Sequence, residues 1–186
     1  MARYRRYYRR YVRTAKKKWA SNAMDVRLTT LTIPATGFHA IGQCILSNED
    51  RISNDAAAVK SSAQILKTSR FKFRGVISFN TSSNVSLLYF ITYVPEGALA
   101  LFTGNGELSA FGNFGFYTHP EWVMAWGRKD FVNNSTSNEI SLTTKLKRNL
   151  NSGDAIYFIA CWVNPGASST NASLINGTVS YMCCAN

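Results

Sequence analysis

The sequence predicts an all-β protein, specifically a single jelly roll: an eight-stranded antiparallel β-sandwich with one or two short helices in its loops and a disordered basic N-terminal arm. Three observations predict it. Seven or eight segments have the apolar or alternating pattern of strands. Loops rich in Asn, Ser and Gly separate these segments. The first 18 residues carry charge and contribute no strand pattern.

Two parts of the chain are expected. Residues 1–24 form the arm and a linker, and residues 25–186 form the jelly-roll domain. The arm holds nine of the 21 Lys and Arg residues and no acid, so the rest of the chain has 12 cations against 10 acids. Because like charges repel one another and are not easily buried, the arm is expected to be disordered by itself. The 168 residues after position 18 suffice for one domain with a hydrophobic core.

The strands of the domain follow from apolar or alternating runs that end at turn residues. In chain order they are expected at residues 25–33, 38–46, 70–80, 84–97, 138–150, 154–166 and 173–184. Residues 119–126 are expected to form a short turn of helix after Pro120, with an aromatic strand as the alternative. Strands joined by such loops favour two antiparallel sheets packed face to face.

One helix is expected at residues 53–69. Ser53 or Asn54 can cap its N-terminus, Asp55 lies in its first turn, and three alanines follow. The helix is expected to run through the apolar pair that ends at Leu66.

Two of the strands alternate, which predicts that one face is buried and the other is exposed and basic. In residues 70–80, Phe71, Phe73, Ile77 and Phe79 share the apolar face, and Lys72, Arg74, Ser78 and Asn80 share the polar one. In residues 138–150, Ile140, Leu142 and Leu146 lie opposite Ser141, Thr143, Lys145 and Lys147.

Two other strands, in residues 84–97 and 154–166, are apolar on both faces until Pro95 and Gly97 stop the first and Pro165 and Gly166 stop the second. They therefore need cover on both sides. The loops, the helix or a neighbouring copy of the chain are the candidates for this cover. The residues expected on the outward face are Leu88, Phe90, Phe158 and Ala160, opposite Leu87, Tyr89, Ile91, Tyr157 and Ile159.

The arginines and tyrosines of the arm indicate that its partner is a nucleic acid. Arginine fits phosphate oxygens with a planar fork of donors, and tyrosine offers a face for an unpaired base, worth about 1–3 kcal/mol per base. The tyrosines follow a helical spacing, so the arm can form a helix on binding. The alternatives are a solvated tail used only for import or adhesion, and a membrane-surface helix, for which tyrosine is a weak anchor. The predicted nucleic-acid-binding residues are Arg3, Tyr4, Arg5, Arg6, Tyr7, Tyr8, Arg9, Arg10, Tyr11, Arg13, Lys16, Lys17 and Lys18, with Lys72 and Arg74 of the domain.

Several classes of protein and of site are not expected. The sequence has neither the apolar block of a secretory signal peptide nor a membrane-spanning stretch, so we expect a soluble protein without disulfides. The four cysteines lack metal-ligand spacing, and neither His39 nor His119 has a recognisable catalytic partner. The expectation is therefore no enzyme, no cofactor and no metal.

The order of the segments resembles that of the capsid proteins of small circular single-stranded DNA viruses, the circoviruses and their relatives. The likeness covers roughly residues 1–163. It rests on the basic arm, the Ala-rich segment running into "ILKTSRFKFRGVISF", the strand end "YVPEG" and the segment "LKRNLNSGDAIYFI". This chain departs from circoviruses in the tyrosines of its arm and in its shorter body.

The resemblance implies a coat subunit, about sixty copies of which close a T=1 icosahedral shell around a single-stranded DNA genome. It also implies an arm that acts as a nuclear localisation signal, and hence the host import machinery as a partner, with the virion and the host nucleus as locations. The alternatives are a non-capsid protein that binds single strands and the coat protein of a satellite RNA virus. In a shell, the aromatics expected at the subunit interface are Phe111, Phe114, Phe116, Trp122 and Trp126; alternatively, they cover their own sandwich.

Overall fold

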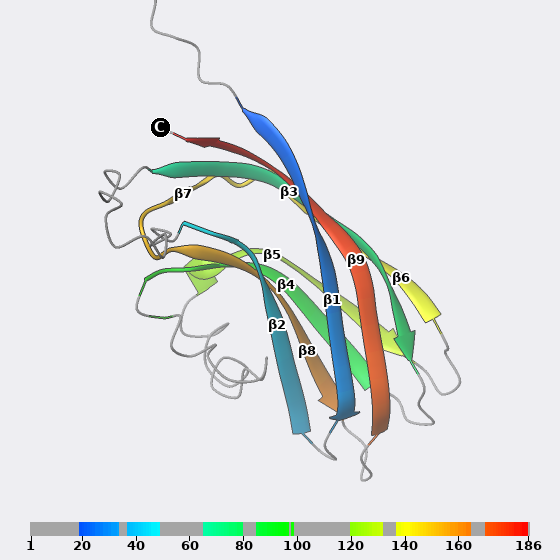
Figure 1. The fold of residues 1–186 in the computed structure, drawn as a ribbon. Helices are drawn as coiled ribbons and strands as arrows, with labels where there is room; N and C mark the ends of the chain where they lie inside the picture. The colour runs from blue at the N-terminus through cyan, green and yellow to red at the C-terminus, as the bar shows by residue number, and fades with distance from the viewer. Residues whose placement is uncertain are drawn as a thin grey trace, which may run out of the picture.

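A computed structural model describes residues 19–33, 37–48, 65–79, 85–96, 98, 120–131, 137–164 and 170–185. It confirms the predicted class, because the described residues are almost entirely antiparallel β-strands in two facing sheets (Figure 1). The elements are β1 (Ala20–Ile33), β2 (Gly37–Ser47), β3 (Leu66–Phe79), β4 (Val85–Val94), the 3-10 helix η2 (Pro120–Trp122), β5 (Val123–Phe131), β6 (Ser137–Thr144), β7 (Arg148–Leu150), β8 (Ala155–Asn164) and β9 (Thr170–Ala185).

The strand order is that of a jelly roll. Sheet A has the order β1-β9-β3-β6, with β7 also paired to β3, and sheet B has the order β2-β8-β4-β5. The first half of the chain pairs with the second half as nested antiparallel ladders: β1 with β9, β2 with β8, β3 with β6, and β4 with β5. This nesting gives the two sheets their Greek-key connections.

The hydrophobic core lies between the two sheets. The alternation of β3 is confirmed, because Phe71, Phe73 and Ile77 are fully buried there. Phe73 lies against two glycines, Gly75 and Gly177, that face each other across β3 and β9. A Cβ on Gly177 would lie 2.6 Å from the Phe73 ring and 2.5 Å from the carbonyl oxygen of Arg74. Glycine therefore lets this ring lie close to sheet A, where it also packs against the Phe158 ring of sheet B, with centroids 4.3 Å apart.

A second apolar cluster covers the outer face of sheet B, as expected for strands that are apolar on both sides. Its buried members are Ala40, Phe90, Ile159 and Cys161, with Leu88, Trp122, Val123 and Tyr157 packed against them. The outward face predicted for β8 is wrong, because Phe158 and Ala160 belong to the core between the sheets. Periodicity separates the two faces of a strand, but strands that are apolar on both faces leave the inner one undetermined.

The helix predicted at residues 53–69 is wrong at its C-terminal end. Leu66 begins β3, and residues 66–68 pair with β9 on one side and β7 on the other. Hydrogen bonds to two neighbouring strands outweigh the local helix signal of the alanines. The rest of that segment, residues 53–64, lies outside the described residues. The helical turn expected after Pro120 is confirmed as η2, which leads directly into β5.

The strand predicted at residues 138–150 is two strands. β6 ends at Thr144 and β7 begins at Arg148. Leu146, expected in the core, is 51% exposed, and its N–H donates to the Thr144 hydroxyl oxygen at 3.1 Å. At the other end of the domain, β1 begins at Ala20, so residues 20–24, expected in the linker, belong to sheet A.

Asp154 joins three chain segments at one end of the sandwich. Its buried carboxylate accepts hydrogen bonds from the Tyr93 hydroxyl at 2.9 Å, the Glu96 N–H at 3.0 Å and the Asn151 N–H at 2.8 Å. Its backbone carbonyl accepts a hydrogen bond from the N–H of Asn48 at 2.9 Å. The ends of β2 and β4 are therefore fixed to the turn before β8.

Side chains hinder the pairing of a further strand at two edges of the sandwich. The Gln43 carboxamide of β2 accepts a hydrogen bond from the Arg27 N–H at 3.0 Å and donates to the Asp25 carbonyl at 3.1 Å, so it occupies the free edge of β1. On edge strand β5, Lys129 lies opposite Leu87, a core residue, and so places a charge on the inward side. Such features oppose the addition of a further strand. In the described part of the chain, no helix has the length and hydrophobicity that crossing a membrane requires.

Candidate nucleic-acid interface

The predicted nucleic-acid-binding residues fall into two groups. Those of the arm, residues 3–18, lie outside the described residues, as do Phe111, Phe114 and Phe116 of the predicted subunit interface. Lys72 and Arg74 are described, and both are exposed on the outer face of sheet A.

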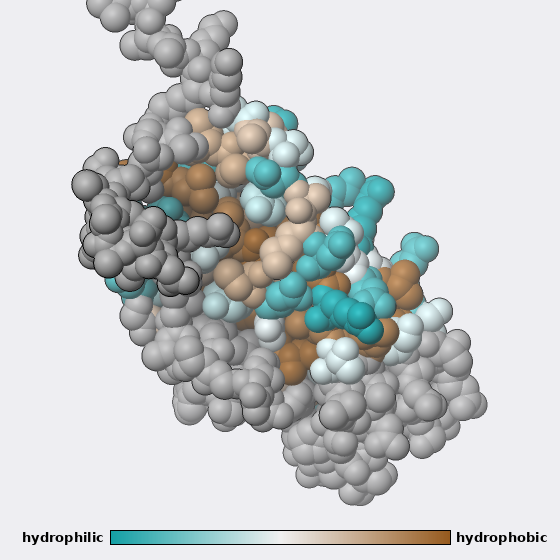
Figure 2. Space-filling model, viewed as in Figure 1, coloured by the Kyte–Doolittle hydropathy of each residue, from teal (hydrophilic) through white to brown (hydrophobic). Residues whose placement is uncertain are grey.

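The outer face of sheet A is polar beside these two cations. Across the β3–β9 ladder Lys72 lies opposite Ser180, and across the β3–β6 ladder it lies opposite Thr143. Arg74 lies in the next row, between Thr178 and Ser141. Directly opposed residues share one face of a sheet, so the cations are flanked by hydroxyl groups. Figure 2 shows hydrophilic side chains projecting along this side of the molecule, beyond β9 and β6.

A β-bulge in β3 extends the row of cations. The β3–β9 register shifts between Ser69 and Lys72, and Arg70 has a φ of 56°, in the left-handed region. A bulge inserts one residue and so reverses the alternation of side chains on either side of it. Before the bulge Thr68 is buried, whereas after it Phe71 and Phe73 are buried.

The consequence is that Lys67 lies on the same face of sheet A as Lys72 and Arg74. Strict alternation would place an odd-numbered lysine on the inner face, with the phenylalanines. Arg70 is also exposed and donates to the Met182 sulfur at 3.8 Å. We call Lys67, Arg70, Lys72 and Arg74 the β3 cation row. Sequence reasoning missed Lys67 because it expected a helix there, and no local signal marks the bulge, which depends on pairing with β9. Arg70 was the first residue of the strand expected at 70–80 but was not named as a binding residue, although alternation places it on the face of Lys72.

The interruption between β6 and β7 lies opposite this bulge. Phe71 pairs with Thr144 and Thr68 pairs with Arg148, so residues 145–147 leave the sheet beside Arg70. Lys145 and Lys147 are exposed there and add two cations next to the row.

Few acids neutralise this face. Among the described residues, no member of the β3 cation row makes an ion pair within 4.0 Å. The acids of the outer face are Asp25, which accepts a hydrogen bond from the Thr178 hydroxyl at 3.0 Å, and Glu139, which lies opposite Val76. Glu139 and Arg74 line an open cavity of about 730 Å³ on this face, together with Gly75, Val76, Ile140 and Ser141.

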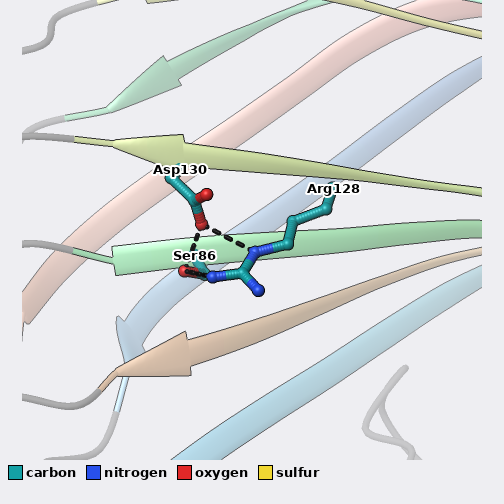
Figure 3. A network of polar contacts seen from close by, with 3 residues as sticks. All are labelled: Ser86, Arg128 and Asp130. Atoms are coloured by element: carbon teal, nitrogen blue, oxygen red, sulfur yellow. Dashed lines mark hydrogen bonds and ion pairs between the residues drawn. The ribbon is translucent and has the colours of Figure 1, made fainter.

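In sheet B, by contrast, the exposed Arg128 has an acidic partner, as Figure 3 shows. Arg128 on β5 lies 2.9 Å from the carboxylate of Asp130, which also accepts a hydrogen bond from the Ser86 hydroxyl at 2.5 Å. The Ser86 hydroxyl and the Arg128 guanidinium lower the pKa of Asp130, so the carboxylate stays charged. Arg128 is therefore already paired, in contrast to the β3 cation row.

The arm joins the domain beside the β3 cation row. Ala20, the first residue of β1, pairs with Cys183 of β9, and Cys183 pairs with Thr68 of β3. Lys67 is thus two strands away from the point where the nine cations of the arm enter the sheet. Figure 1 shows β1 starting at the same end of sheet A as the C-terminal end of β9. β1 therefore begins at the end of sheet A where the β3 cation row begins.

Of the predicted interface aromatics, two are described, and they differ in exposure. Trp122 of η2 packs against the second apolar cluster and is partly buried. Trp126 of β5 lies directly opposite Phe90 of that cluster but is 63% exposed. Trp126 therefore extends the apolar surface of sheet B outward to its edge. The described residues contain no group of three or more His, Cys, Asp and Glu side chains placed to hold a metal ion.

No protein-family model and no curated protein matches the chain. Among solved structures, the decameric BFDV capsid protein is similar over 90% of this chain and 99% of that chain, at 8% identity and a TM-score of 0.37. Mud crab tombus-like virus is similar over 92% and 83%, at 9% identity and a TM-score of 0.36. The 60-mer BFDV capsid protein is similar over 92% and 95%, at 8% identity and a TM-score of 0.35. With TM-scores below 0.5, these likenesses carry no inference about function.

Proposed function

We propose that this chain is a viral capsid protein that assembles into a small icosahedral shell and packages a single-stranded nucleic acid through its basic N-terminal arm. The observation that carries the proposal is the junction of the two parts. β1, which follows the nine cations of the predicted arm, begins at the end of sheet A where the β3 cation row begins, and among the described residues no member of this row makes an ion pair within 4.0 Å. Phosphate is the ligand that such a region attracts most strongly. The role is structural rather than catalytic.

In a T=1 shell, about sixty arms would supply on the order of 540 positive charges on the inner side. This charge would offset the repulsion within a confined genome and make assembly depend on it. The genome of this proposal is single-stranded DNA, with RNA as the alternative. The arm would also act as a nuclear localisation signal recognised by the host import machinery, so the protein would occur in the host nucleus and in the virion.

Contacts between copies are proposed to use faces and loops rather than free strand edges. The Gln43 carboxamide and the inward Lys129 oppose strand addition at β1 and β5. The exposed indole of Trp126, continuous with a buried apolar cluster, is the contact that sheet B offers. Trp122, Phe111, Phe114 and Phe116 are proposed to contribute to the same interface.

Negative-stain microscopy of the purified full-length protein tests the proposal, with and without added single-stranded DNA. Uniform hollow particles are expected. Monomers, or irregular fibres that coat the DNA without closing, would contradict the shell and favour the runner-up, a single-strand-binding protein.

Replacing Trp126 with Ser is expected to abolish the particles while the chain stays folded, because the indole is mostly exposed in one chain. Circular dichroism and sedimentation velocity would measure folding and assembly together. Val76→Ser is the matched control, since Val76 is a partly exposed apolar residue on sheet A. Aggregation or global unfolding of the Trp126 variant would show instead that the indole belongs to the subunit's own core.

A further inference from the structure

We infer that the outer face of sheet A holds a second, arm-independent binding track for the phosphate backbone of a single strand, formed by Lys67, Arg70, Lys72 and Arg74. This inference rests on the proposed function and adds a site to it. The arm lies outside the described residues, whereas the β3 cation row is fixed in a sheet. A fixed row sets where along the subunit a strand lies.

The geometry of β3 makes the row linear. A strand advances about 3.3 Å per residue, and one of the seven steps from Lys67 to Arg74 is the extra residue of the bulge, so the two residues are roughly 20 Å apart along β3. Stacked nucleotides advance about 3.4 Å each, so the row spans about six nucleotides. The bulge at Arg70 is what produces this alignment, because it brings Lys67 to the face that Lys72 and Arg74 occupy. A backbone φ of 56° is rare for arginine. Here it occurs where the cations before and after Arg70 lie on the same face of the sheet.

The chemistry of the row suits phosphate. In the described residues its members have no carboxylate partner within 4.0 Å, so binding an anion breaks no existing ion pair. Hydroxyl groups flank the row on both sides: Ser180 and Thr178 on β9, and Ser141 and Thr143 on β6. Arginine, lysine and hydroxyl side chains are the usual donors to phosphate oxygens, and such contacts fix position without reading sequence.

A single strand fits this arrangement better than a duplex. At Lys72 and Arg74 the row is one cation wide, because the directly opposed residues on β9 and β6 are serines and threonines. Lys145 and Lys147 add cations only beside Arg70, and Glu139 lies one row beyond Arg74. A duplex presents two phosphate backbones separated by a groove of about 6–12 Å, so most of its phosphates on the protein side would meet uncharged residues. The row also begins beside the entry of an arm whose tyrosines can stack on unpaired bases. An acidic segment of a second copy is the competing occupant of the row.

The test compares four full-length proteins: the intact chain, K67Q/R70Q, K72Q/R74Q, and the control R128Q/K129Q, which loses the same charge from sheet B. Each is titrated with a short fluorescent oligodeoxythymidine over a series of NaCl concentrations. With about 0.7 per phosphate contact on single strands, each β3 variant is expected to reduce the log-log salt slope by about 1.4. The control is expected to leave the slope unchanged.

The outcomes separate the track from the proposed function. If both β3 variants keep the intact slope, or if the control lowers it equally, the track is wrong, while particles seen by microscopy would leave the capsid proposal standing. If the β3 variants keep the slope but fail to form particles, the row contacts a second copy, and the track is again wrong. If the slopes fall as expected but the intact protein forms no particles, the track stands and the shell fails.

Discussion

Deletion of residues 1–18 is expected to remove most of the affinity for single-stranded nucleic acid while leaving the domain folded. The deletion removes nine cations and no residue of the described strands, the first of which begins at Ala20. Nine phosphate contacts at about 0.7 each contribute roughly −6 to the log-log salt slope. The deletion should remove this contribution and leave only the smaller one of the β3 cation row. Fluorescence titration at several salt concentrations measures the slope, and circular dichroism measures the fold.

A full-length variant with the four arm tyrosines changed to Ser separates charge from stacking. It should keep the salt slope but lose affinity by about 1–3 kcal/mol for each stacked base. In cells, a fused reporter should lose nuclear accumulation when the arm is deleted. A truncated protein that binds as tightly as the intact chain would disprove the arm's role in binding, and unchanged accumulation would disprove its role in import.

Replacing Asp154 with Ala is expected to have the largest effect on stability of any single substitution discussed here. It leaves the Tyr93 hydroxyl and the N–H groups of Glu96 and Asn151 without their acceptor, in a place where the carboxylate is only 4% exposed. The expected loss is about 3 kcal/mol, since an unsatisfied buried polar group costs roughly 1–3 kcal/mol. For a chain of this size the melting temperature should fall by roughly 6–12 °C.

Asp130→Ala is the matched control, because Asp130 is an exposed carboxylate in a surface ion pair. It should leave the melting temperature almost unchanged. If the two variants melted alike, Asp154 would not be the residue that holds this end of the sandwich together.

The same cluster predicts a loss of stability in alkali. Burial and, after it, the hydrogen bond to Asp154 raise the pKa of Tyr93 from 10.0 to about 12. The folded chain holds the Tyr93 proton more tightly than the unfolded chain does. The protonated hydroxyl therefore stabilises the fold fully below pH 10, and this stabilisation is lost as the pH rises through about 12. Thermal melts across this window measure the loss, which should be smaller in Asp154→Asn. An equal loss in both proteins would show that the Asp154 carboxylate does not contribute to it.

Sequence patterns were sufficient wherever the signal is local. The alternation of residues 70–80 correctly separated Phe71, Phe73 and Ile77 from Lys72 and Arg74, because the period of two is a property of the strand itself. Turn residues placed the ends of β4 and β8 at Pro95 and Pro165 to within one residue. The count of such strands predicted the jelly roll.

Features that depend on a partner strand could not be predicted in this way. The two segments "YVPEG" and "LNSGD" are more than fifty residues apart, and the carboxylate of Asp154 joins them only after β4 and β8 have paired. The inner face of β8 was assigned wrongly because both of its faces are apolar, and packing against sheet A decides between them.

In the candidate site, too, some features follow from local sequence and others depend on strand pairing. By itself, the sequence determined the concentration of nine cations in an arm, the β class of the body and the outward direction of Lys72 and Arg74, since composition and a period of two need no partner. Only the tertiary structure decided that Lys67 joins them and that β1 begins beside the row. The physical reason is that a bulge exists only relative to the strand it pairs with: β9 shifts its register against β3 at Arg70, and that shift turns an odd-numbered lysine to the even-numbered face.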